Sequence, residues 1–187
     1  MLVERLQSLG KKVLLLREPG GTATGEAIRT ILLENKVGGD DRMTALAETF
    51  LFQAARAQLI DEVIRPALEK GTWVICDRFT LSTLVYQGYA GGIDKKWVEQ
   101  VSKAAVQGLW PDRYFVLWVS PNVGVSRREH RAADRMESKG DVFVKAVASG
   151  FKAAVKREPK KYTVIDAQDS IDAVQKKMWK SLEPLLK

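Results

Sequence analysis

Four short apolar runs constrain the fold of this chain more than any other feature of its sequence. None of them alternates polar with apolar residues, and all are rich in residues that favour strands. Runs of this kind are typical of strands that are covered on both faces, as in a parallel sheet. They occupy residues 13–16, 73–76, 114–119 and 162–165.

Helical patterns separate these runs. The predicted helices cover residues 25–34, 44–69, 94–108, 123–135, 141–156 and 170–186. Asp94 fits the N-cap position of its helix, and Pro66 is expected near the end of the longest helix or at a break in it. Strands that alternate with helices predict an α/β fold in which a parallel sheet is flanked by helices. No internal repeat or low-complexity linker divides residues 1–187, so we expect a single domain.

Cysteine and histidine counts limit the available chemistry. Cys76 is the only cysteine and His130 the only histidine, which excludes an internal disulfide and a Cys/His metal cluster. No apolar run approaches the length of a membrane span, and the first residues do not have the features of a signal peptide. We therefore expect a cytoplasmic protein without a membrane partner.

The net charge is +7, and residues 145–187 hold ten Lys/Arg against five Asp/Glu. A solvated basic surface is one interpretation of this excess, and attraction to polyanions is the other. A basic nucleic-acid binder stays open on charge alone, but no stripe of alternating basic and aromatic residues is present to stack bases. Phosphorylated small molecules need fewer charges, placed close together. We therefore expect such molecules as partners, and we do not expect nucleic acid to be a partner.

Polar and glycine-rich segments follow each predicted strand. They read REPGG after residue 16, DRFTLSTLVYQG after residue 76, SPNVG after residue 119 and DAQDS after residue 165. Ligands of parallel α/β sheets bind outside the carboxyl ends of the strands. These four segments therefore indicate where a pocket would open.

The segment after residue 76 carries the most hydrogen-bonding groups. Asp77 at the strand end could hold Mg²⁺ through water and Arg78 could bind a phosphate with its two parallel N–H donors, although an ordinary ion pair is the alternative. An aromatic hydroxyl and an amide on one helical face suit a sugar and a base. The residues that provide such a face are Ser82, Thr83, Tyr86 and Gln87.

Two further patterns have both a functional and a structural interpretation. Phe52 and Arg56 lie four apart on one helix face, where a ring and a guanidinium could stack on a base and donate to its edge. Alternatively, Phe52 belongs to the core and Arg56 is a surface charge. Arg127, Arg131 and Arg135 are also spaced by four, which fits either a solvated face or a lid that closes on a transferring phosphoryl group.

Taken together, these segments resemble the thymidylate kinase family of nucleoside monophosphate kinases, which have the P-loop NTPase fold. The resemblance runs nearly end to end and rests on the order and spacing of five segments rather than on any one of them. They read REPGGT, AETFLFQAARAQLIDEVIRPALEKGTWVICDR, STLVYQGYAGGID, PDRYFVLWVSPNVGVSRR and TVIDAQDS.

The resemblance implies that the γ-phosphoryl group of ATP is transferred to dTMP, giving dTDP, with Mg²⁺ bound. It also implies a role for each residue that matches a nucleoside-binding position of the family. Phe52 would stack on thymine and Arg56 would reach its O4 atom. Thr83 and Gln87 would contact the remaining base edge, with Ser82 alongside. Tyr86 would contact the deoxyribose.

The remaining roles implied by the family concern phosphates, metal, donor nucleotide and assembly. Arg29 and Arg78 would hold the acceptor phosphate with Glu18 nearby, and Asp77 would lie beside the metal. Arg78 would also be a catalytic cation. A lid at about 126–140 would supply three further catalytic cations, namely Arg127, Arg131 and Arg135. Ala167 and Gln168 would border adenine. The family usually dimerises through the long helix that holds Phe52, so a homodimer is expected.

The start of the chain departs from the family pattern. Family members begin with a strand and a glycine-rich loop, whereas Leu2, Leu6 and Leu9 already belong to the helix that follows, and the motif G-x-x-x-x-G-K-[ST] does not occur in the 187 residues. Three explanations are open: the strands at 73–76 and 114–119 close onto each other, something else fills the gap, or the natural start lies about two dozen residues upstream of Met1. We expect the third. The fold is then a sheet without its first, central strand, which leaves unpaired edges on the strands at 73–76 and 114–119.

Two functional hypotheses follow from this departure. The first is a dTMP kinase whose activity is weak or absent in the chain as given. The second is a catalytically dead homologue that keeps the dTMP pocket.

Overall fold

The computed structural model describes residues 2–34, 43–120, 123–124, 127 and 134–186. All four apolar runs form strands, and each begins at the predicted residue. The strands are β1 (Val13–Arg17), β2 (Trp73–Asp77), β3 (Tyr114–Trp118) and β4 (Tyr162–Asp166). The alternation of strands and helices confirms the predicted α/β class.

The helices follow the predicted periodicity closely. The α-helices are α1 (Leu2–Ser8), α2 (Ala23–Leu33), α3 (Ala45–Leu59), α4 (Arg65–Glu69), α5 (Thr80–Thr83), α6 (Lys95–Val106), α8 (Asp141–Arg157) and α9 (Ile171–Leu182). Two π-helical segments, η1 (Ile60–Ile64) and η2 (Leu84–Ala90), and two short 3₁₀ turns, η3 (Glu137–Lys139) and η4 (Glu183–Leu185), complete the described elements. The helix predicted at 123–135 lies largely outside the described residues.

Side-chain caps determine where several helices begin. Thr22 accepts a hydrogen bond from the Gly25 backbone amide at 2.9 Å, so α2 begins two residues earlier than predicted. The predicted cap Asp94 is confirmed, since its carboxylate accepts from the Trp97 amide at 2.8 Å. Such bonds satisfy amides that have no partner within the helix.

The long helix predicted at 44–69 is continuous but contains the π-helical turn η1 directly before Pro66. Proline has no N–H to donate, and its ring clashes with the carbonyl four residues earlier. A wider π turn relieves this crowding without ending the helix. The break expected at Pro66 is therefore a local change of helix type.

The strands form two parallel pairs rather than one sheet. In the first pair Val13 lies opposite Trp73 and Arg17 opposite Asp77; in the second, Tyr114 lies opposite Tyr162. Among the described residues β2 pairs only with β1, and β3 only with β4. The strands β2 and β3 do not close onto each other, so each keeps one edge without a strand partner, as expected for a sheet without the strand between them.

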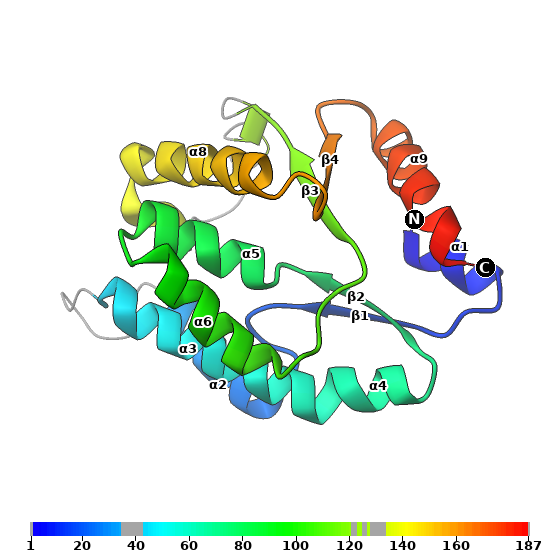
Figure 1. The fold of residues 1–187 in the computed structure, drawn as a ribbon, viewed down its shortest axis with the longest axis horizontal. Helices are drawn as coiled ribbons and strands as arrows, with labels where there is room; N and C mark the ends of the chain where they lie inside the picture. Colours follow the sequence, from blue (N-terminus) through cyan, green and yellow to red (C-terminus); the bar gives the residue numbers. More distant parts are fainter. Residues whose placement is uncertain (1, 35–42, 121–122, 125–126, 128–133, 187) are drawn as a thin grey trace.

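The helices lie on both sides of the strands (Figure 1). Helices α3, α5, α6 and α8 lie on one side, where the main core includes the buried residues Leu59, Val85 and Val98. Helices α1 and α9 lie together on the other side, next to both chain ends. Their contact includes the guanidinium of Arg5, which lies 3.8 Å from the ring centroid of Trp179.

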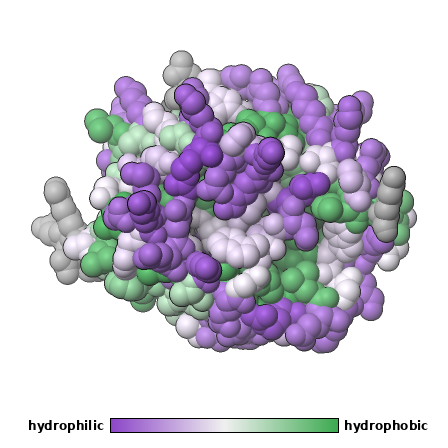
Figure 2. Space-filling model, in the orientation of Figure 1, coloured by the Kyte–Doolittle hydropathy of each residue, from purple (hydrophilic) through white to green (hydrophobic). Residues whose placement is uncertain are grey.

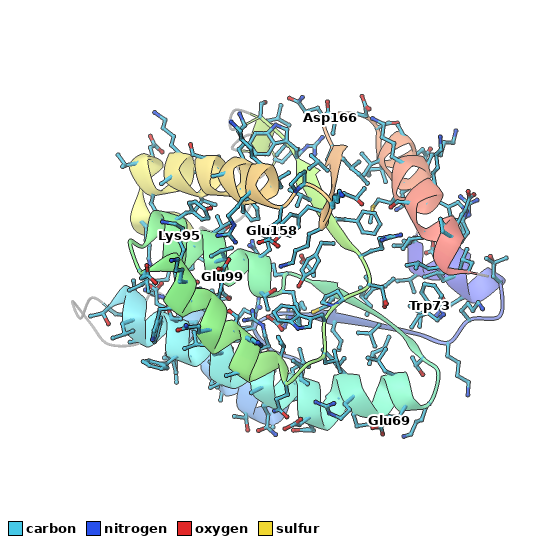
Figure 3. The ribbon with its side chains drawn as sticks, viewed as in Figure 1. Glu69, Trp73, Lys95, Glu99, Glu158 and Asp166 are labelled. Carbon is cyan, nitrogen blue, oxygen red and sulfur yellow. The ribbon has the colours of Figure 1, made fainter. Side chains whose placement is uncertain are left out.

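Ion pairs join the elements at the surface. Arg157 at the end of α8 donates to Glu99 on α6 and, at 2.9 Å, to Glu158. Figure 3 labels these two glutamates. On the face shown in Figure 2, hydrophobic residues form separate patches in a mostly hydrophilic surface. Within the described ranges, none of the helices combines the length and apolar character needed to cross a bilayer.

Candidate functional site

A cavity of about 240 Å³ opens at the carboxyl ends of β1 and β2. Its walls come from the turn after β1, from α2 and α3, from the segment after β2, and from the residues before η3. The residues that line it are Arg17, Glu18, Pro19, Arg29, Leu33, Phe52, Arg56, Asp77, Arg78, Phe79, Ser82, Thr83, Tyr86, Gln87, Asp134 and Met136. The structure therefore brings together the residues predicted to contact the base, the sugar, the acceptor phosphate and the metal.

Arg56 forms the buried floor of this cavity. Its side chain is 1% exposed, and its Nη2 atom lies 2.6 Å from a carboxylate oxygen of Glu18. Nε also donates to Glu18, while Nη1 donates to the Gln53 side-chain oxygen at 2.7 Å and Nη2 to the Thr83 hydroxyl at 3.1 Å. The guanidinium lies 5.2 Å from the ring centroid of Phe79. The interpretation of Arg56 as a surface charge is therefore wrong.

Glu18 is the partner that makes this burial tolerable. A buried guanidinium is costly unless a carboxylate and further acceptors satisfy it. Burial raises the pKa of the Glu18 carboxyl above its ordinary value, against the opposite effect of Arg56. The backbone amide of Glu18 donates to the Asp77 carbonyl at 2.9 Å, which fixes the turn after β1 against the end of β2.

The turn after Glu18 depends on two glycines. The backbone φ angles are 136° at Gly20 and 83° at Gly21, in the region that favours glycine. A Cβ atom at Gly21 would lie 2.7 Å from Leu59 Cδ1, and the Gly21 amide donates to Glu26 at 2.8 Å. The glycines are required by a tight turn that packs on α3 and leads into α2.

Arg78 has an unusual backbone at the cavity wall. Its φ angle is 68°, a left-handed conformation that costs a residue with a Cβ atom about 1–3 kcal/mol. Its Nη1 atom donates to the Tyr86 hydroxyl at 3.3 Å, and the guanidinium lies 5.4 Å from the Tyr86 ring centroid. Edge contacts with Phe143 and Phe151 of α8 hold the Tyr86 ring. Strain of this kind is characteristic of functional sites.

Several cations converge on the cavity. Arg29 donates to the Pro19 carbonyl at 2.8 Å, which places its guanidinium at the turn after β1. Burial lowers the pKa of Arg29, and the positive charges of Arg17 and Arg78 contribute in the same direction. Repulsion between these arginines would be relieved by a bound anion. The electrostatics of this wall therefore suit a phosphate group.

Two of the arginines predicted for the lid, Arg127 and Arg135, do not line this cavity. Arg127 donates to the Ala167 carbonyl at 2.9 Å, next to Gln168, whose backbone amide donates to Asp166 at 3.0 Å. The predicted adenine-bordering residues thus meet one predicted lid arginine at a separate location. Arg131 lies outside the described residues.

Arg135, in the last part of the predicted lid, contacts helices α2 and α3. Its Nε atom donates to the Leu32 carbonyl at 2.7 Å, and its Nη2 atom lies 2.8 Å from a carboxylate oxygen of Glu48 on α3. Glu48 is 1% exposed and was not predicted as a functional residue. Glu48, Phe52 and Arg56 follow one another at a spacing of four and therefore share one helix face, and this spacing could have identified Glu48.

Asp77 is the candidate metal ligand at the cavity. Its carboxylate is exposed at the end of β2. The described residues contain no group of three or more His, Cys, Asp or Glu side chains arranged to hold a metal. Mg²⁺ is commonly held by one or two carboxylates, waters and substrate phosphates, so a single exposed aspartate beside an anion site fits this ion.

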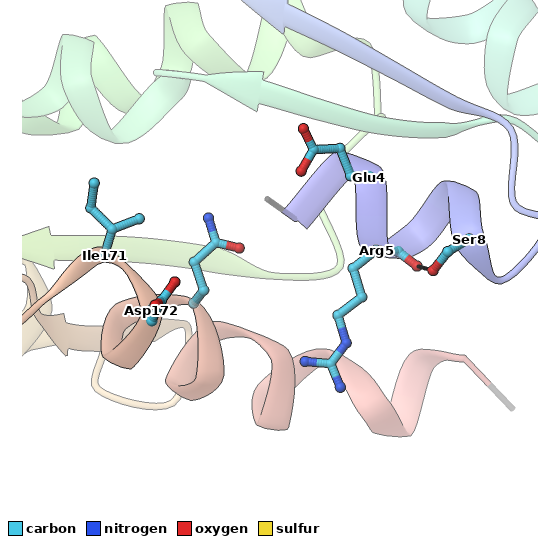
Figure 4. Close-up of a pocket in the computed structure, with 6 residues that line it drawn as sticks. Glu4, Arg5, Ser8, Ile171 and Asp172 are labelled. Carbon is cyan, nitrogen blue, oxygen red and sulfur yellow. Dashed lines mark hydrogen bonds between the residues drawn. The ribbon is translucent and has the colours of Figure 1, made fainter.

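A larger depression of about 430 Å³ lies elsewhere, between α1 and α9 (Figure 4). It is lined by Glu4, Arg5, Ser8, Ile171, Asp172 and Gln175. None of the predicted site residues contributes to it. Its size alone therefore does not make it the stronger candidate.

A parallel α/β fold with an arginine-rich cavity at its strand ends is consistent with a protein of the nucleoside monophosphate kinase type. Comparison of the sequence with known proteins is more specific. The sequence model described as thymidylate kinase matches residues 1–178, and the chain belongs to the thymidylate kinase family.

Curated bacterial relatives support this assignment across the whole chain. The thymidylate kinase of Pelotomaculum thermopropionicum is 43% identical over an alignment that includes all of this chain and 86% of the relative. Those of Caldanaerobacter subterraneus and of a Synechococcus strain are 40% and 42% identical, again over all of this chain and over 88% and 87% of the relatives.

Proposed function

We propose that the cavity binds dTMP and that the protein transfers the γ-phosphoryl group of ATP to it, giving dTDP. The buried contact between Arg56 and Glu18 at the cavity floor is the observation that carries this proposal. Glu18, Gln53 and Thr83 hold the guanidinium rigidly, while Nη1 carries a second hydrogen beyond the one donated to Gln53. A pyrimidine carbonyl is a suitable acceptor for that hydrogen.

The other cavity residues have complementary roles. The half-buried ring of Phe52 stacks on the base, since aromatic stacking is available to any base face. Thr83, Gln87 and Ser82 contact the base edge, and Tyr86 packs against the deoxyribose. Arg29 and Arg78 hold the acceptor phosphate with charge-assisted hydrogen bonds, which are stronger than neutral ones.

The donor side of the reaction involves the second cluster. Asp77 would hold Mg²⁺, and the ion would supply neutralisation of phosphate charge when bound. Ala167 and Gln168 border the adenine of ATP, next to Arg127, which bonds to Ala167. Arg127, Arg131 and Arg135 serve as lid arginines, although the contacts of Arg135 with Leu32 and Glu48 also fit an anchoring role.

Replacement of Phe52 by alanine is expected to weaken dTMP binding by about tenfold or more, because stacking contributes about 1–3 kcal/mol per base. Isothermal titration calorimetry of the 187-residue chain with dTMP measures this directly. Trp110→Ala is the control, since Trp110 is 43% exposed and does not line the cavity. A wild-type chain that releases no heat with dTMP, while remaining folded by circular dichroism, contradicts the proposal.

A second candidate function is dTMP binding without phosphoryl transfer. It is favoured by one observation, that the 187 residues contain no G-x-x-x-x-G-K-[ST] motif to hold donor phosphates. We infer that the chain as given transfers phosphate weakly or not at all while it still binds dTMP. A coupled assay of ADP release separates the two functions, because turnover at ordinary kinase rates excludes the second.

We also propose that the protein forms a homodimer through the long helix α3. Leu46 and Phe50 on this helix are 45% and 54% exposed, although Phe50 makes an edge contact with Trp97. Phe50→Glu is expected to convert the dimer to a monomer, measured by size-exclusion chromatography with light scattering. The exposed Leu68→Glu on α4 is the control. A wild-type mass of one chain overturns this proposal.

A further inference from the structure

The strongest unassigned feature of the site is a buried polar cluster around Glu48. One carboxylate oxygen of Glu48 lies 2.8 Å from Nη2 of Arg135 and 2.5 Å from Nζ of Lys139. The other oxygen accepts a hydrogen bond from the side-chain nitrogen of Gln87 at 3.2 Å. Glu48 and Gln87 are each 1% exposed. One carboxylate thus joins α3, η2 and the segment around η3.

The contact with Glu48 determines how the Gln87 amide is oriented. A carboxylate only accepts hydrogen bonds, so it requires the NH₂ end of the amide to face it. The oxygen of Gln87 then faces away from Glu48, and it is buried without a hydrogen-bond partner among the described residues. Gln87 lines the cavity. A buried acceptor without a donor costs about 1–3 kcal/mol, so this oxygen favours a ligand that brings a donor.

We propose that Glu48 is a positioning residue that orients the Gln87 amide and thereby selects pyrimidines with an N–H donor at ring position 3. Thymine and uracil carry this donor, whereas cytosine has an acceptor there and would face the Gln87 oxygen with a lone pair. This inference rests on the proposed binding of dTMP in the cavity. Glu48 acts through Gln87 and does not itself contact the base.

The cations beside Glu48 strengthen the orientation. Arg135 and Lys139 both bind one oxygen, and these two charge-assisted contacts hold the carboxylate in place with its other oxygen against Gln87. Their side chains are only 18% and 26% exposed, which limits screening by water. The orientation of the Gln87 amide is therefore set by Glu48, Arg135 and Lys139, which do not line the cavity.

Glu48→Gln is the sharpest test, because it keeps shape and changes only the donor pattern. Arg135 and Lys139 would hold the oxygen of the new amide, so its NH₂ group would face Gln87. Gln87 would then reverse and present its own NH₂ group to the cavity. We expect dTMP binding to weaken by about tenfold or more, and the ratio of dTMP to dCMP affinity to fall by at least the same factor, measured by calorimetry.

Matched variants separate orientation from general damage. Glu62→Gln makes the same chemical change in η1, where the exposed Glu62 bonds to Gln58, and it should leave the affinity ratio unchanged. Gln87→Met removes the amide and should lower the ratio. In the Gln87→Met background, the further change Glu48→Gln should not alter the ratio. If Glu48→Gln changes the affinity ratio further in this double variant, Glu48 does not act through Gln87.

Glu48→Asp keeps the negative charge beside the two cations but withdraws the carboxylate from Gln87 by one methylene. It therefore carries the test if Glu48→Gln does not fold, and it should also lower the ratio. A folded Glu48 variant with the wild-type ratio overturns the inference. If the folded wild-type chain binds no dTMP, the proposed function itself fails, and that result is distinct because it needs no variant.

Discussion

Replacing Arg56 with alanine is expected to lower the free energy of unfolding by about 3–5 kcal/mol, the largest stability effect of any single change proposed for this chain. The reason is that Glu18, whose side chain is 4% exposed, would be left buried without its charged partner. Gln53 and Thr83 would also lose a bonding partner. Urea denaturation followed by circular dichroism measures the loss.

Arg65→Ala is the matched control for this prediction. Arg65 lies in α4 of the same long helical stretch, but its side chain is 38% exposed and lies 3.7 Å from the carboxylate of Asp61. Exposed pairs of this kind contribute about 0–1 kcal/mol. If Arg56→Ala and Arg65→Ala unfold at the same urea concentration, the buried pair does not stabilise the fold as described.

The stability deficit of Arg56→Ala should depend on pH. Burial raises the pKa of Glu18, and the lowering effect of Arg56 is absent in the variant. Glu18 in the folded variant then keeps its proton to a higher pH than it does in the unfolded chain. Its stability is retained at low pH and lost as the pH rises through the raised pKa of Glu18. The difference from wild type should accordingly grow as the pH rises above 4.5, the ordinary pKa of a glutamate carboxyl.

The double variant Glu18→Leu/Arg56→Met separates stability from function. Apolar residues of similar volume often replace a buried ion pair without loss of stability. We expect most of the stability to return, while dTMP binding does not, because no guanidinium is left to donate to the base. Recovery of dTMP affinity in the double variant would show that Arg56 does not contact the base.

Arg78→Gly is expected to affect stability and binding in opposite directions. Glycine adopts the φ angle of 68° without strain, so the free energy of unfolding should be unchanged or rise by about 1 kcal/mol. Loss of the guanidinium should weaken dTMP binding by about 10- to 100-fold, since hydrogen bonds to charged groups contribute about 1.5–3 kcal/mol. Thermal unfolding and calorimetry provide the two measurements.

Gln107→Gly is the control for the backbone effect. Gln107 also has a left-handed backbone, with a φ angle of 50°, but it follows α6 and does not line the cavity. Its replacement should leave dTMP affinity unchanged and stability unchanged or slightly higher. If Arg78→Gly binds dTMP as tightly as wild type, Arg78 does not hold the acceptor phosphate.

The sequence predicted the local elements because their signals are local. Each strand start was predicted from a run of apolar residues, and the cap at Asp94 was predicted from its position before a helical pattern. The rule that ligands bind at the carboxyl ends of parallel strands pointed to Glu18, Arg78 and Gln87, and the family resemblance added Arg29 and Phe52. All five residues line one cavity. The roles assigned to them stay predictions.

Long-range contacts were not predictable in this way. Hydropathy places Arg56 on the surface, but Glu18, 38 positions away, allows it to be buried. Glu48 carried no functional signal by itself, because its partner Lys139 lies 91 positions further along the chain. The sequence by itself determined the α/β class, the strand positions and the residues available for a nucleotide. Only the tertiary structure decided the register within each strand pair and the partners of each charge, because these depend on how elements pack across sequence distances that no local pattern encodes.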